Sequence, residues 1–254
     1  MSRIVVKVGS AVLTQDNAIA LERMRALVDF ITELKNQHEV ILVSSGAVSA
    51  GYTALQLDRN ILKNKQALAA IGQPILMKKY AQKFELHDIL TAQVLVTSAN
   101  LSKPDDIKRI KNTIDTLLGK NVLPIVNEND ATSTEELEVG DNDQLSAYIT
   151  KHTDADMLII LSDIDAYYDK DPRAHNDAKA LKIVTGIEKT ELEKVVTPNN
   201  VFATGGIVTK LKAAQYLFDN NIDMFLASGF DLSDIKSFMI DSLHKGGTLF
   251  KAKK

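Results

Sequence analysis

The stretch RIVVKVGSAVLT, residues 3–14, decides which fold class the chain belongs to. Its first half is a nearly continuous apolar run that contains Ile4, Val5, Val6 and Val8. Such runs are typical of strands covered on both faces, as in a parallel sheet between helix layers. One lysine, Lys7, interrupts the run, and Gly9 follows closely. The stretch alone favours neither of two interpretations: an edge strand whose lysine reaches solvent, or a strand whose lysine binds a ligand beyond its carboxyl end.

Similar apolar runs recur outward along the chain, at 40–44, 92–96, 122–127, 157–162 and 223–228. The segments between them include apolar stripes with helical spacing over 21–34 and 107–118. We expect the second of these helices to begin with the capping pattern Ser102-x-x-Asp105 and to end at Gly119. Alternating strands and helices predict an α/β fold with right-handed crossovers.

The composition limits the classes of function. The chain has 254 residues, 45% of them hydrophobic, a formal net charge of −3 and no cysteine. That length allows one large domain or two modest ones, and the mild acidity argues against a nucleic-acid partner. No apolar run reaches the ~18 residues that cross a bilayer, and the N-terminus lacks the apolar core of a signal peptide. We therefore expect a soluble cytoplasmic protein that binds neither nucleic acid nor membrane.

Several nucleotide and metal motifs are missing from the sequence. Neither the Walker A pattern GxxxxGK[ST] nor the dinucleotide pattern GxGxxG occurs, and the protein-kinase motifs HRD and DFG are absent. The five histidines show no metal-ligand spacing, and the acidic residues around Asp141 lack the spacing of a calcium-binding loop. A metal held by protein carboxylates alone is not expected, whereas Mg²⁺ carried on phosphates is compatible with the sequence.

A second lysine stands out in TGGIVTKLKAAQYLF, residues 204–218, which is typical of a Gly-Gly turn leading into a helix. At ~100° per residue, Lys210 falls within the apolar arc of this helix, whereas Lys212 points away from it. Burial and the positive helix N-terminus both disfavour a cation there, and an anion would relieve both penalties. Because a glycine-rich helix start is suited to phosphate, we favour a phosphate site at Gly205-Gly206 over an ordinary amphipathic helix.

Two polar tetrads, NEND at 127–130 and GDND at 140–143, flank one long segment. Each tetrad alone is weak evidence, because Asn and Asp are common in turns. Together they offer groups suited to an α-amino acid, Asp for an ammonium and Asn for a carboxylate, and they could also orient lysines. A smaller signal is VSSGAVSAG at 43–51, where a strand ends in serines before a helix of small residues. That helix start would hold an anion, or the serines would simply cap it.

Taken together, the motifs closely resemble the amino-acid kinase family, and within it the enzymes that act on free glutamate. The resemblance rests, in chain order, on KVGSAVLT, SSGAVSAG, KQALAAIGQ, NENDA, VGDNDQLSA, LSDIDAYYDKDPR, TGGIVTK and GTLF. It implies a three-layer α/β/α sandwich around a mostly parallel sheet. It also implies that ATP, with Mg²⁺, phosphorylates the γ-carboxylate of L-glutamate to glutamyl 5-phosphate, the first step of proline synthesis.

The resemblance also implies roles for individual residues. The catalytic residues would be Lys7 and Lys210, which contact the transferring phosphoryl group, and Asp143, which holds them in place. Glutamate would be bound by Ser45, Asp130 and Asn142, with Asn127 nearby. The nucleotide would be bound by Lys7, Gly9, Ser162, Asp163, Thr204, Gly205, Gly206, Ile207, Val208, Thr209 and Lys210. Ser162 stands where the family often has threonine, and Ser10-Ala11 replace a commoner Thr-Ser pair.

The organisation of the family is implied as well. Residues 1–254 would form a single kinase domain, with glutamate bound mainly by residues 1–150 and the nucleotide mainly by 151–254. Many members continue past GTLF into an RNA-associated domain, which we expect to be absent here. Feedback inhibition by proline, a homodimer or homotetramer, and coupling to glutamyl 5-phosphate reductase are further expectations. The rival interpretations are a kinase for N-acetylglutamate, aspartate or UMP, and a non-catalytic sensor of nucleotides or amino acids.

Overall fold

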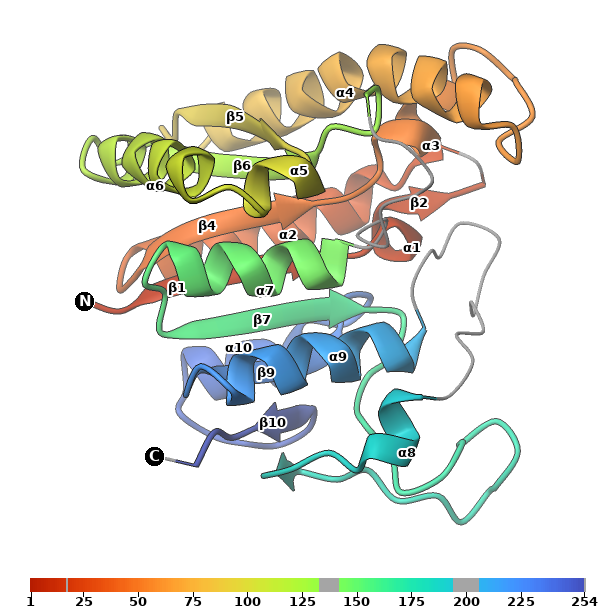
Figure 1. Cartoon of the computed structure of the whole chain (residues 1–254), viewed down its shortest axis with the longest axis vertical. Coiled ribbons are helices and arrows are strands. Elements are labelled where there is room, and N and C mark those ends of the chain that lie inside the picture. The colour runs from red at the N-terminus through yellow and green to blue at the C-terminus, as the bar shows by residue number, and fades with distance from the viewer. Residues whose placement is uncertain (17, 133–141, 194–205, 254) are drawn as a thin grey trace.

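The chain folds around one large sheet, shown in Figure 1. A computed structural model describes the chain except residues 17, 133–141, 194–205 and 254. Within this described part the sheet has eight strands, in the spatial order β5 (Thr91–Val96), β6 (Leu123–Glu128), β4 (Glu39–Ser44), β1 (Arg3–Val8), β7 (Met157–Ser162), β9 (Asp223–Ser228), β10 (Thr248–Phe250) and β8 (Ile183–Val184). The strands from β5 to β9 in this order are parallel, whereas β10 is antiparallel to β9 and parallel to β8.

Strand β1 lies in the interior of the sheet, between β4 and β7. Lys7 is opposite Val43 on one side and Ile160 on the other. An edge strand would leave one of these sides open to solvent, and Lys7 is only 4% exposed. The edge-strand interpretation of Lys7 is therefore wrong, and its charge must be stabilised inside the protein.

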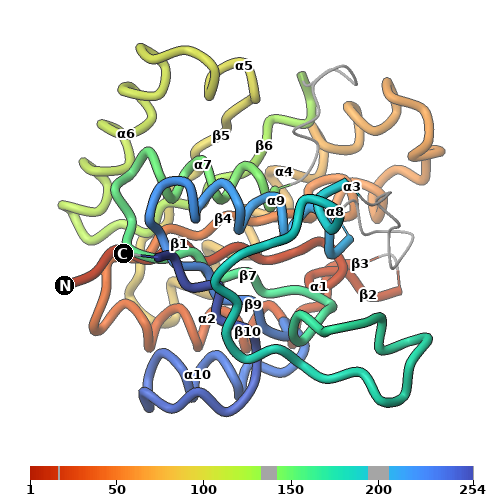
Figure 2. Tube along the Cα trace, turned by 60° about the horizontal axis from the view of Figure 1, so that its bottom comes forward, coloured from red at the N-terminus to blue at the C-terminus, as the bar shows by residue number. Residues whose placement is uncertain are grey.

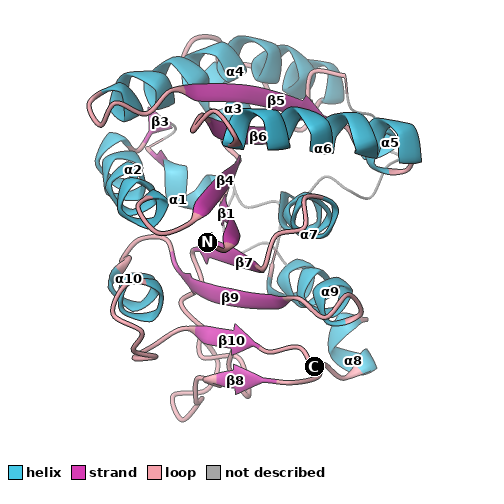
Figure 3. Cartoon of the chain, turned by 90° about the vertical axis from the view of Figure 1, so that its left-hand side faces the viewer, coloured by secondary structure: helices cyan, strands magenta, loops and turns pink. Residues whose placement is uncertain are grey.

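Helices cover both faces of the sheet and so form three layers (Figure 3). One face is covered by α2 (Leu21–Lys35), α4 (Leu62–Glu85) and α10 (Ser233–Met239). The opposite face is covered by α6 (Pro104–Leu118), α7 (Asn142–His152) and α9 (Ile207–Phe218). Each helix layer shares a separate apolar core with its face of the sheet. This arrangement confirms the predicted α/β/α sandwich with a mostly parallel sheet.

Side-chain alternation along β1 decides which helix layer each of its residues meets. Ile4, Val6 and Val8 pack into the core of α2, α4 and α10, whereas Val5 packs into the core of α6, α7 and α9. Lys7 follows Val5 by two positions, so both side chains point to the same face. The strand thereby directs the lysine toward the layer that contains α7 and α9.

The shorter elements are α1 (Ser10–Leu13), α3 (Ala47–Tyr52), α5 (Ser98–Leu101), α8 (Lys189–Leu192) and the hairpin of β2 (Thr14–Gln15) with β3 (Ala18–Ile19). Helix α3 packs very closely on α4, because glycines lie in the contact. A Cβ atom at Gly72 would be 1.8 Å from the Ala47 carbonyl oxygen, and one at Gly51 would be 1.9 Å from the Leu68 carbonyl oxygen. Because neither glycine has a side chain, α3 and the turn that precedes it can pack directly against α4.

The two termini lie at the same end of the sheet, away from the carboxyl ends of the parallel strands, as Figures 1 and 2 show. The Ala252 backbone N–H donates to Asp223 Oδ1 at 2.9 Å, which ties the last residues to the start of β9. Among the described residues, no helix combines the length and the apolar character needed to cross a membrane.

The six predicted strands are confirmed to within one residue at each end, and the predicted helices correspond to α2, α6 and α9. The predicted cap of α6 is wrong, although its end at Gly119 is confirmed. Ser102 belongs to the end of α5, where its Oγ donates to the Ser98 carbonyl oxygen at 3.1 Å. Helix α6 begins instead at Pro104, because proline has a suitable fixed φ and no N–H to leave unpaired. Periodicity missed β2, β3, β8 and β10, which are two or three residues long.

Candidate active site

The polar residues singled out in the sequence gather at the carboxyl ends of neighbouring parallel strands. Strand β1 contributes Lys7, β4 leads into Ser45, β6 carries Asn127 and β7 ends at Ser162. Since these strands are ordered β6-β4-β1-β7, the four residues follow one edge of the sheet. Open parallel sheets bind their ligands at this edge, outside the carboxyl ends of the strands.

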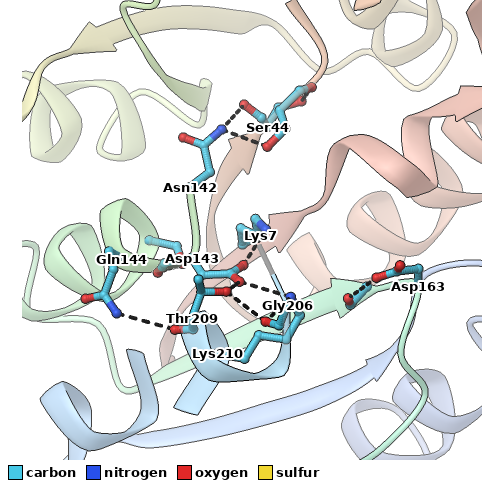
Figure 4. A network of polar contacts seen from close by, with 12 residues as sticks. Lys7, Ser44, Asn142, Asp143, Gln144, Asp163, Gly206, Thr209 and Lys210 are labelled. Carbon is cyan, nitrogen blue, oxygen red and sulfur yellow. Dashed lines mark hydrogen bonds and ion pairs between the residues drawn. The ribbon is translucent and has the colours of Figure 1, made fainter. Parts of the chain in front are cut away.

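Two lysines from distant parts of the chain meet at one carboxylate (Figure 4). Lys7 Nζ pairs with Asp143 Oδ1, and Lys210 Nζ lies 3.0 Å from Asp143 Oδ2. We call these three residues the charged cluster. Asp143 is fully buried, and Lys7 and Lys210 are 4% and 3% exposed. The structure thus brings together the three residues predicted to be catalytic, with Asp143 between the lysines as the resemblance implied.

The starts of two helices position the charged cluster. Asp143 lies in the first turn of α7, and Lys210 lies in the first turn of α9. The hydroxyl Oγ1 of Thr209 lies 2.9 Å from Asp143 Oδ2 and 2.8 Å from the Gly206 carbonyl oxygen. Gln144 Nε2 donates to the Thr209 carbonyl oxygen at 3.3 Å. These bonds join α7 to α9, so the charged groups are held by helices rather than by a loop.

Asp143 is ionised despite its burial. Burial alone would raise the pKa of Asp143, but the positive charges of Lys210 and Lys7 lower it well below the ordinary value of an aspartate. The two ammonium groups and the one carboxylate together carry a net positive charge. The N-terminal end of α9 adds positive potential at the same place. The charged cluster is therefore suited to a ligand with several negative charges, such as a phosphate chain.

Asn142, which directly precedes Asp143 in α7, forms hydrogen bonds with other uncharged side chains. Asn142 Nδ2 donates to Ser45 Oγ at 2.7 Å and to Asn127 Oδ1 at 3.1 Å. The Ser44 carbonyl oxygen lies 3.4 Å from the same nitrogen. We call Ser45, Asn127 and Asn142 the amide cluster. Because Asn142 and Asp143 are adjacent in α7, the amide cluster and the charged cluster are fixed relative to each other.

A cavity of about 380 Å³ opens beside the amide cluster. Three of the predicted substrate residues, Ser45, Asp130 and Asn142, line this substrate cavity. Other polar side chains in its lining are those of Ser10, Ser49, Tyr52, Asp58, Arg59, Asn60, Lys65 and Glu128. Burial raises the pKa of Asp130, and the positive charge of Lys65 opposes that rise. A cavity that presents both carboxylates and cations is suited to a zwitterion.

The predicted nucleotide residues lie at the ends of β1 and β7 and at the start of α9. Ser162 Oγ donates to Asp163 Oδ1 at 2.9 Å. The Gly9 N–H donates to the Leu161 carbonyl oxygen at 3.1 Å. A Cβ atom at Gly9 would be 3.8 Å from Lys7 Nζ, so the glycine keeps the space beside that ammonium open.

The start of α9 contains the other nucleotide residues that the sequence predicted. Gly206 is the N-cap residue, and Ile207, Val208 and Thr209 form the first turn together with Lys210. Thr204 and Gly205 lie outside the described residues, as do Gly140 and Asp141 of the second polar tetrad. Among the described residues, no three acidic or histidine side chains gather closely enough to hold a metal ion.

A family model described as the amino acid kinase family matches residues 2–228. The chain belongs to this family. It is 51% identical to the glutamate 5-kinase of Wolinella succinogenes, over 98% of each chain. It is 48% identical to the glutamate 5-kinase of Leishmania donovani, over 98% of this chain and 95% of that one. Its fold is similar to that of isopentenyl phosphate kinase, with a TM-score of 0.71 at 16% identity over 98% of this chain and 100% of that one.

Within this amino acid kinase site, the structure separates residues that reach the substrate cavity from residues that lie behind it. Asn127 does not line the cavity: it is 1% exposed and contacts Asn142 from the side of the sheet. Its predicted place in the substrate site is therefore indirect.

Sequence reasoning missed several residues of the cavity wall, among them Tyr52, Arg59 and Lys65. The guanidinium of Arg59 lies 4.5 Å from the centre of the Tyr52 ring. Lys65 opens the motif KQALAAIGQ, so its position in that motif was a usable signal. Tyr52 and Arg59 stand in a segment without a motif, and only the packing of α3 against α4 brings them to the cavity.

Proposed function

We propose that the chain transfers the γ-phosphoryl group of ATP to the γ-carboxylate of L-glutamate, which gives glutamyl 5-phosphate for proline synthesis. The observation that carries this proposal is that Asp143, which pairs with both lysines, directly follows Asn142 in one helix turn, and that Asn142 lines a cavity suited to an amino acid. The name glutamate 5-kinase of relatives at 48% and 51% identity supports the same substrate.

The nucleophile in this reaction is a carboxylate, which has an ordinary pKa of ~4.3 and is ionised at neutral pH. No general base is needed, which agrees with the absence of a histidine from the residues assigned to the site. One oxygen of the carboxylate forms a bond to the γ-phosphorus while the bond from that phosphorus to the ADP oxygen breaks. The difficulty is electrostatic, because two anions must approach each other.

Lys7 and Lys210 would supply the positive charge that this approach requires. In phosphoryl transfer, catalysis consists mostly of positioning and of stabilising charge on the transferring oxygens. Asp143 would keep both ammonium groups in place before ATP binds, so that little rearrangement is needed during the reaction. Mg²⁺, when bound, would neutralise further phosphate charge, and we expect phosphate oxygens and water to hold it.

The substrate cavity would bind the amino-acid end of glutamate. Asp130, once ionised, is suited to the ammonium group, and this predicts discrimination against N-acetylglutamate, which has no ammonium. The nucleotide would lie along the ends of β1 and β7 and the start of α9, near Gly9, Ser162 and Lys210. This assignment gives residues 1–150 most of the glutamate contacts and residues 151–254 most of the nucleotide contacts.

Four further properties belong to this proposal. Proline would inhibit the enzyme by feedback, and the chain would assemble as a homodimer or a homotetramer. Its product, an acyl phosphate, is reactive, so functional coupling to glutamyl 5-phosphate reductase would protect it from hydrolysis. The location would be cytoplasmic, where ATP and glutamate are both available.

Acyl phosphate formation is the test of the proposed function. The purified chain is supplied with ATP, Mg²⁺ and glutamate, and the product is trapped with hydroxylamine, with and without proline. N-acetylglutamate and aspartate are supplied in parallel. We expect hydroxamate with glutamate alone and less of it when proline is present. Product from N-acetylglutamate only would contradict the substrate assignment, and ATP binding without turnover of any substrate would indicate a sensor.

A further inference from the structure

A continuous chain of side-chain amides leads from the substrate cavity to the sheet edge at β5. Asn142 Nδ2 donates to Asn127 Oδ1 at 3.1 Å, and Asn127 Nδ2 donates to Gln73 Oε1 at 2.9 Å. Gln73 Nε2 then donates to Gln93 Oε1 at 3.0 Å. The four residues, which we call the amide chain, come from four different elements: α7, β6, α4 and β5. Such a chain requires all four elements to be in register.

The direction of the amide chain is set at its inner end by the Ser44 carbonyl oxygen, which can only accept hydrogen bonds. Asn142 Nδ2 lies 3.4 Å from this oxygen, so the amide turns its NH₂ group toward it. Asn127 must then present its oxygen to Asn142 and its own NH₂ group to Gln73. Turning round any single amide would set two donors or two acceptors against each other.

This direction determines what Asn142 can offer to a ligand. An amide nitrogen has two hydrogens, and three acceptors, on Ser44, Ser45 and Asn127, share them. The remaining capacity is Asn142 Oδ1, which is buried and has no partner among the described residues. Buried acceptors without a partner are rare in proteins, and the ammonium group of an amino acid is a donor that would satisfy this one. The sequence had suggested the opposite role, an asparagine that binds a carboxylate.

Gln73 lies behind this arrangement rather than in the substrate cavity. It is 8% exposed and does not belong to the lining of that cavity. It lines an adjoining space of about 170 Å³ between α4 and β5, whose wall also includes Asp130. The hydrogen bonds link Gln73 to Asn142 through Asn127, which is 1% exposed and has little freedom to rearrange.

We infer that Gln73 is a positioning residue for the amino-acid substrate: through Asn127, it holds Asn142 so that the Asn142 oxygen is presented to the substrate ammonium group. This inference rests on the proposed function and names the group of the substrate that Asn142 recognises. Loss of the Gln73 oxygen leaves Asn127 with a buried donor and allows both asparagines to turn. The binding of ammonium-bearing substrates should then weaken, whereas the binding of the γ-carboxylate should not.

Gln73→Met tests the inference, because methionine is similar in size but offers no comparable hydrogen bond. We expect the KM for glutamate to rise about five- to tenfold, as the loss of one buried hydrogen bond predicts. The KM for ATP and the inhibition constant of glutarate, which lacks the ammonium group, should stay within about twofold. A merely structural defect would weaken glutamate and glutarate together.

Matched variants complete the experiment. Gln73→Glu keeps an oxygen for Asn127. At this buried position, without a charged partner in the described part of the chain, the carboxyl group should be neutral, so its O–H can donate to Gln93 as the Gln73 amide does, and the KM for glutamate should stay within about twofold of the original value. Gln82→Met places the same substitution on an exposed position of α4 and should change nothing. If Gln73→Met does not fold, Gln93→Met at the exposed end of the amide chain should give the same pattern with a smaller rise in the KM for glutamate, about three- to fourfold.

The outcomes separate this inference from the proposed function. An original chain that makes no glutamyl hydroxamate overturns both. An active original chain overturns this inference alone if Gln73→Met leaves the KM for glutamate unchanged, if it weakens glutarate equally, or if Gln73→Glu behaves like Gln73→Met. A rise confined to glutamate and reversed in Gln73→Glu supports it.

Discussion

The charged cluster and the amide cluster meet at the first turn of α7, through Asp143 and Asn142, yet they use different physics. Lys7, Asp143 and Lys210 are fully or almost fully buried ions, whereas Asn142 and its partners are neutral and bonded amide to amide. A buried ion costs a large desolvation energy unless it has a charged partner, and a buried amide costs much less. The groups with the largest desolvation energy, the three buried ions, therefore lie where the phosphoryl group would be transferred.

This difference predicts that the two clusters affect different kinetic constants. Charges that act on developing negative charge should affect the turnover number, because that charge exists only in the transition state. Neutral hydrogen bonds to the amino-acid end of the substrate act equally in the ground state and the transition state, so they should affect KM. Substitutions in the two clusters should therefore give different kinetic signatures.

The largest expected effect is on stability, from Asp143→Asn. This change leaves two buried ammonium groups without their carboxylate, so the free energy of unfolding at neutral pH should fall by about 3 to 5 kcal/mol. Urea unfolding measures this quantity, and added ATP should restore part of it. Asp177→Asn is the matched control, because Asp177 pairs with Lys170 at the surface and should cost less than about 1 kcal/mol.

The depressed pKa of Asp143 also predicts how the stability difference between the original chain and Asp143→Asn depends on pH. The stabilising effect of Asp143 is present above its unfolded pKa and is lost only as the pH falls through the lower folded pKa. The original chain should therefore remain more stable than Asp143→Asn even at the ordinary pKa of aspartate, ~3.9. Equal stabilities at neutral pH would show that the charged cluster does not stabilise the fold.

The second largest effect is expected on turnover, from Lys210→Ala. One lysine remains beside Asp143, so the fold should persist, while the turnover number should fall by about 10²- to 10³-fold. Lys212→Ala is the control, since Lys212 is exposed on the same helix. Near-normal turnover in folded Lys210→Ala protein would remove Lys210 from the catalytic residues. Lys7→Ala should resemble Lys210→Ala.

The two clusters also differ in how far the sequence alone could predict them. The strands were predictable because their apolar runs are continuous, and Lys210 because it interrupts an apolar helix face. The pairing of Lys7 with Asp143 spans 136 residues and depends on strand order and on where α7 begins, which periodicity does not contain. The family resemblance supplied that pairing.

The amide cluster was less predictable for a physical reason. The direction of an amide depends on which atom faces the Ser44 carbonyl oxygen, and no sequence pattern encodes that contact. Gln73 was missed because a glutamine inside a helix normally indicates a solvated face, whereas α4 buries this one against β6. The edge-strand interpretation of Lys7 remained open until the order of the strands was known.

A smaller effect, confined to KM, is expected from Asp130→Ala in the substrate cavity. A hydrogen bond to a charged group contributes about 1.5 to 3 kcal/mol, so the KM for glutamate should rise by about 10- to 100-fold. The turnover number and the KM for ATP should change little, in contrast to Lys210→Ala. An unchanged KM for glutamate would remove Asp130 from the substrate site. A fall in turnover alone would contradict the prediction that the groups at the amino-acid end of the substrate affect KM.

The smallest expected effect is a displacement of the acid limb of the pH profile. Burial raises the pKa of Asp130, against the opposing charge of Lys65, so in the free enzyme Asp130 takes up a proton at a higher pH than an ordinary aspartate. Protonated Asp130 cannot pair with the ammonium group, so kcat/KM for glutamate should fall as the pH is lowered through that raised pKa. In Asp130→Asn this contribution to the acid limb should be lost, which leaves the γ-carboxyl group of glutamate, at ~4.3. Lys65→Met should move the limb to higher pH, because it removes the charge that opposes the rise. Identical acid limbs in the original chain and Asp130→Asn would show that the ammonium group is recognised by neutral acceptors such as Asn142, and not by the Asp130 charge.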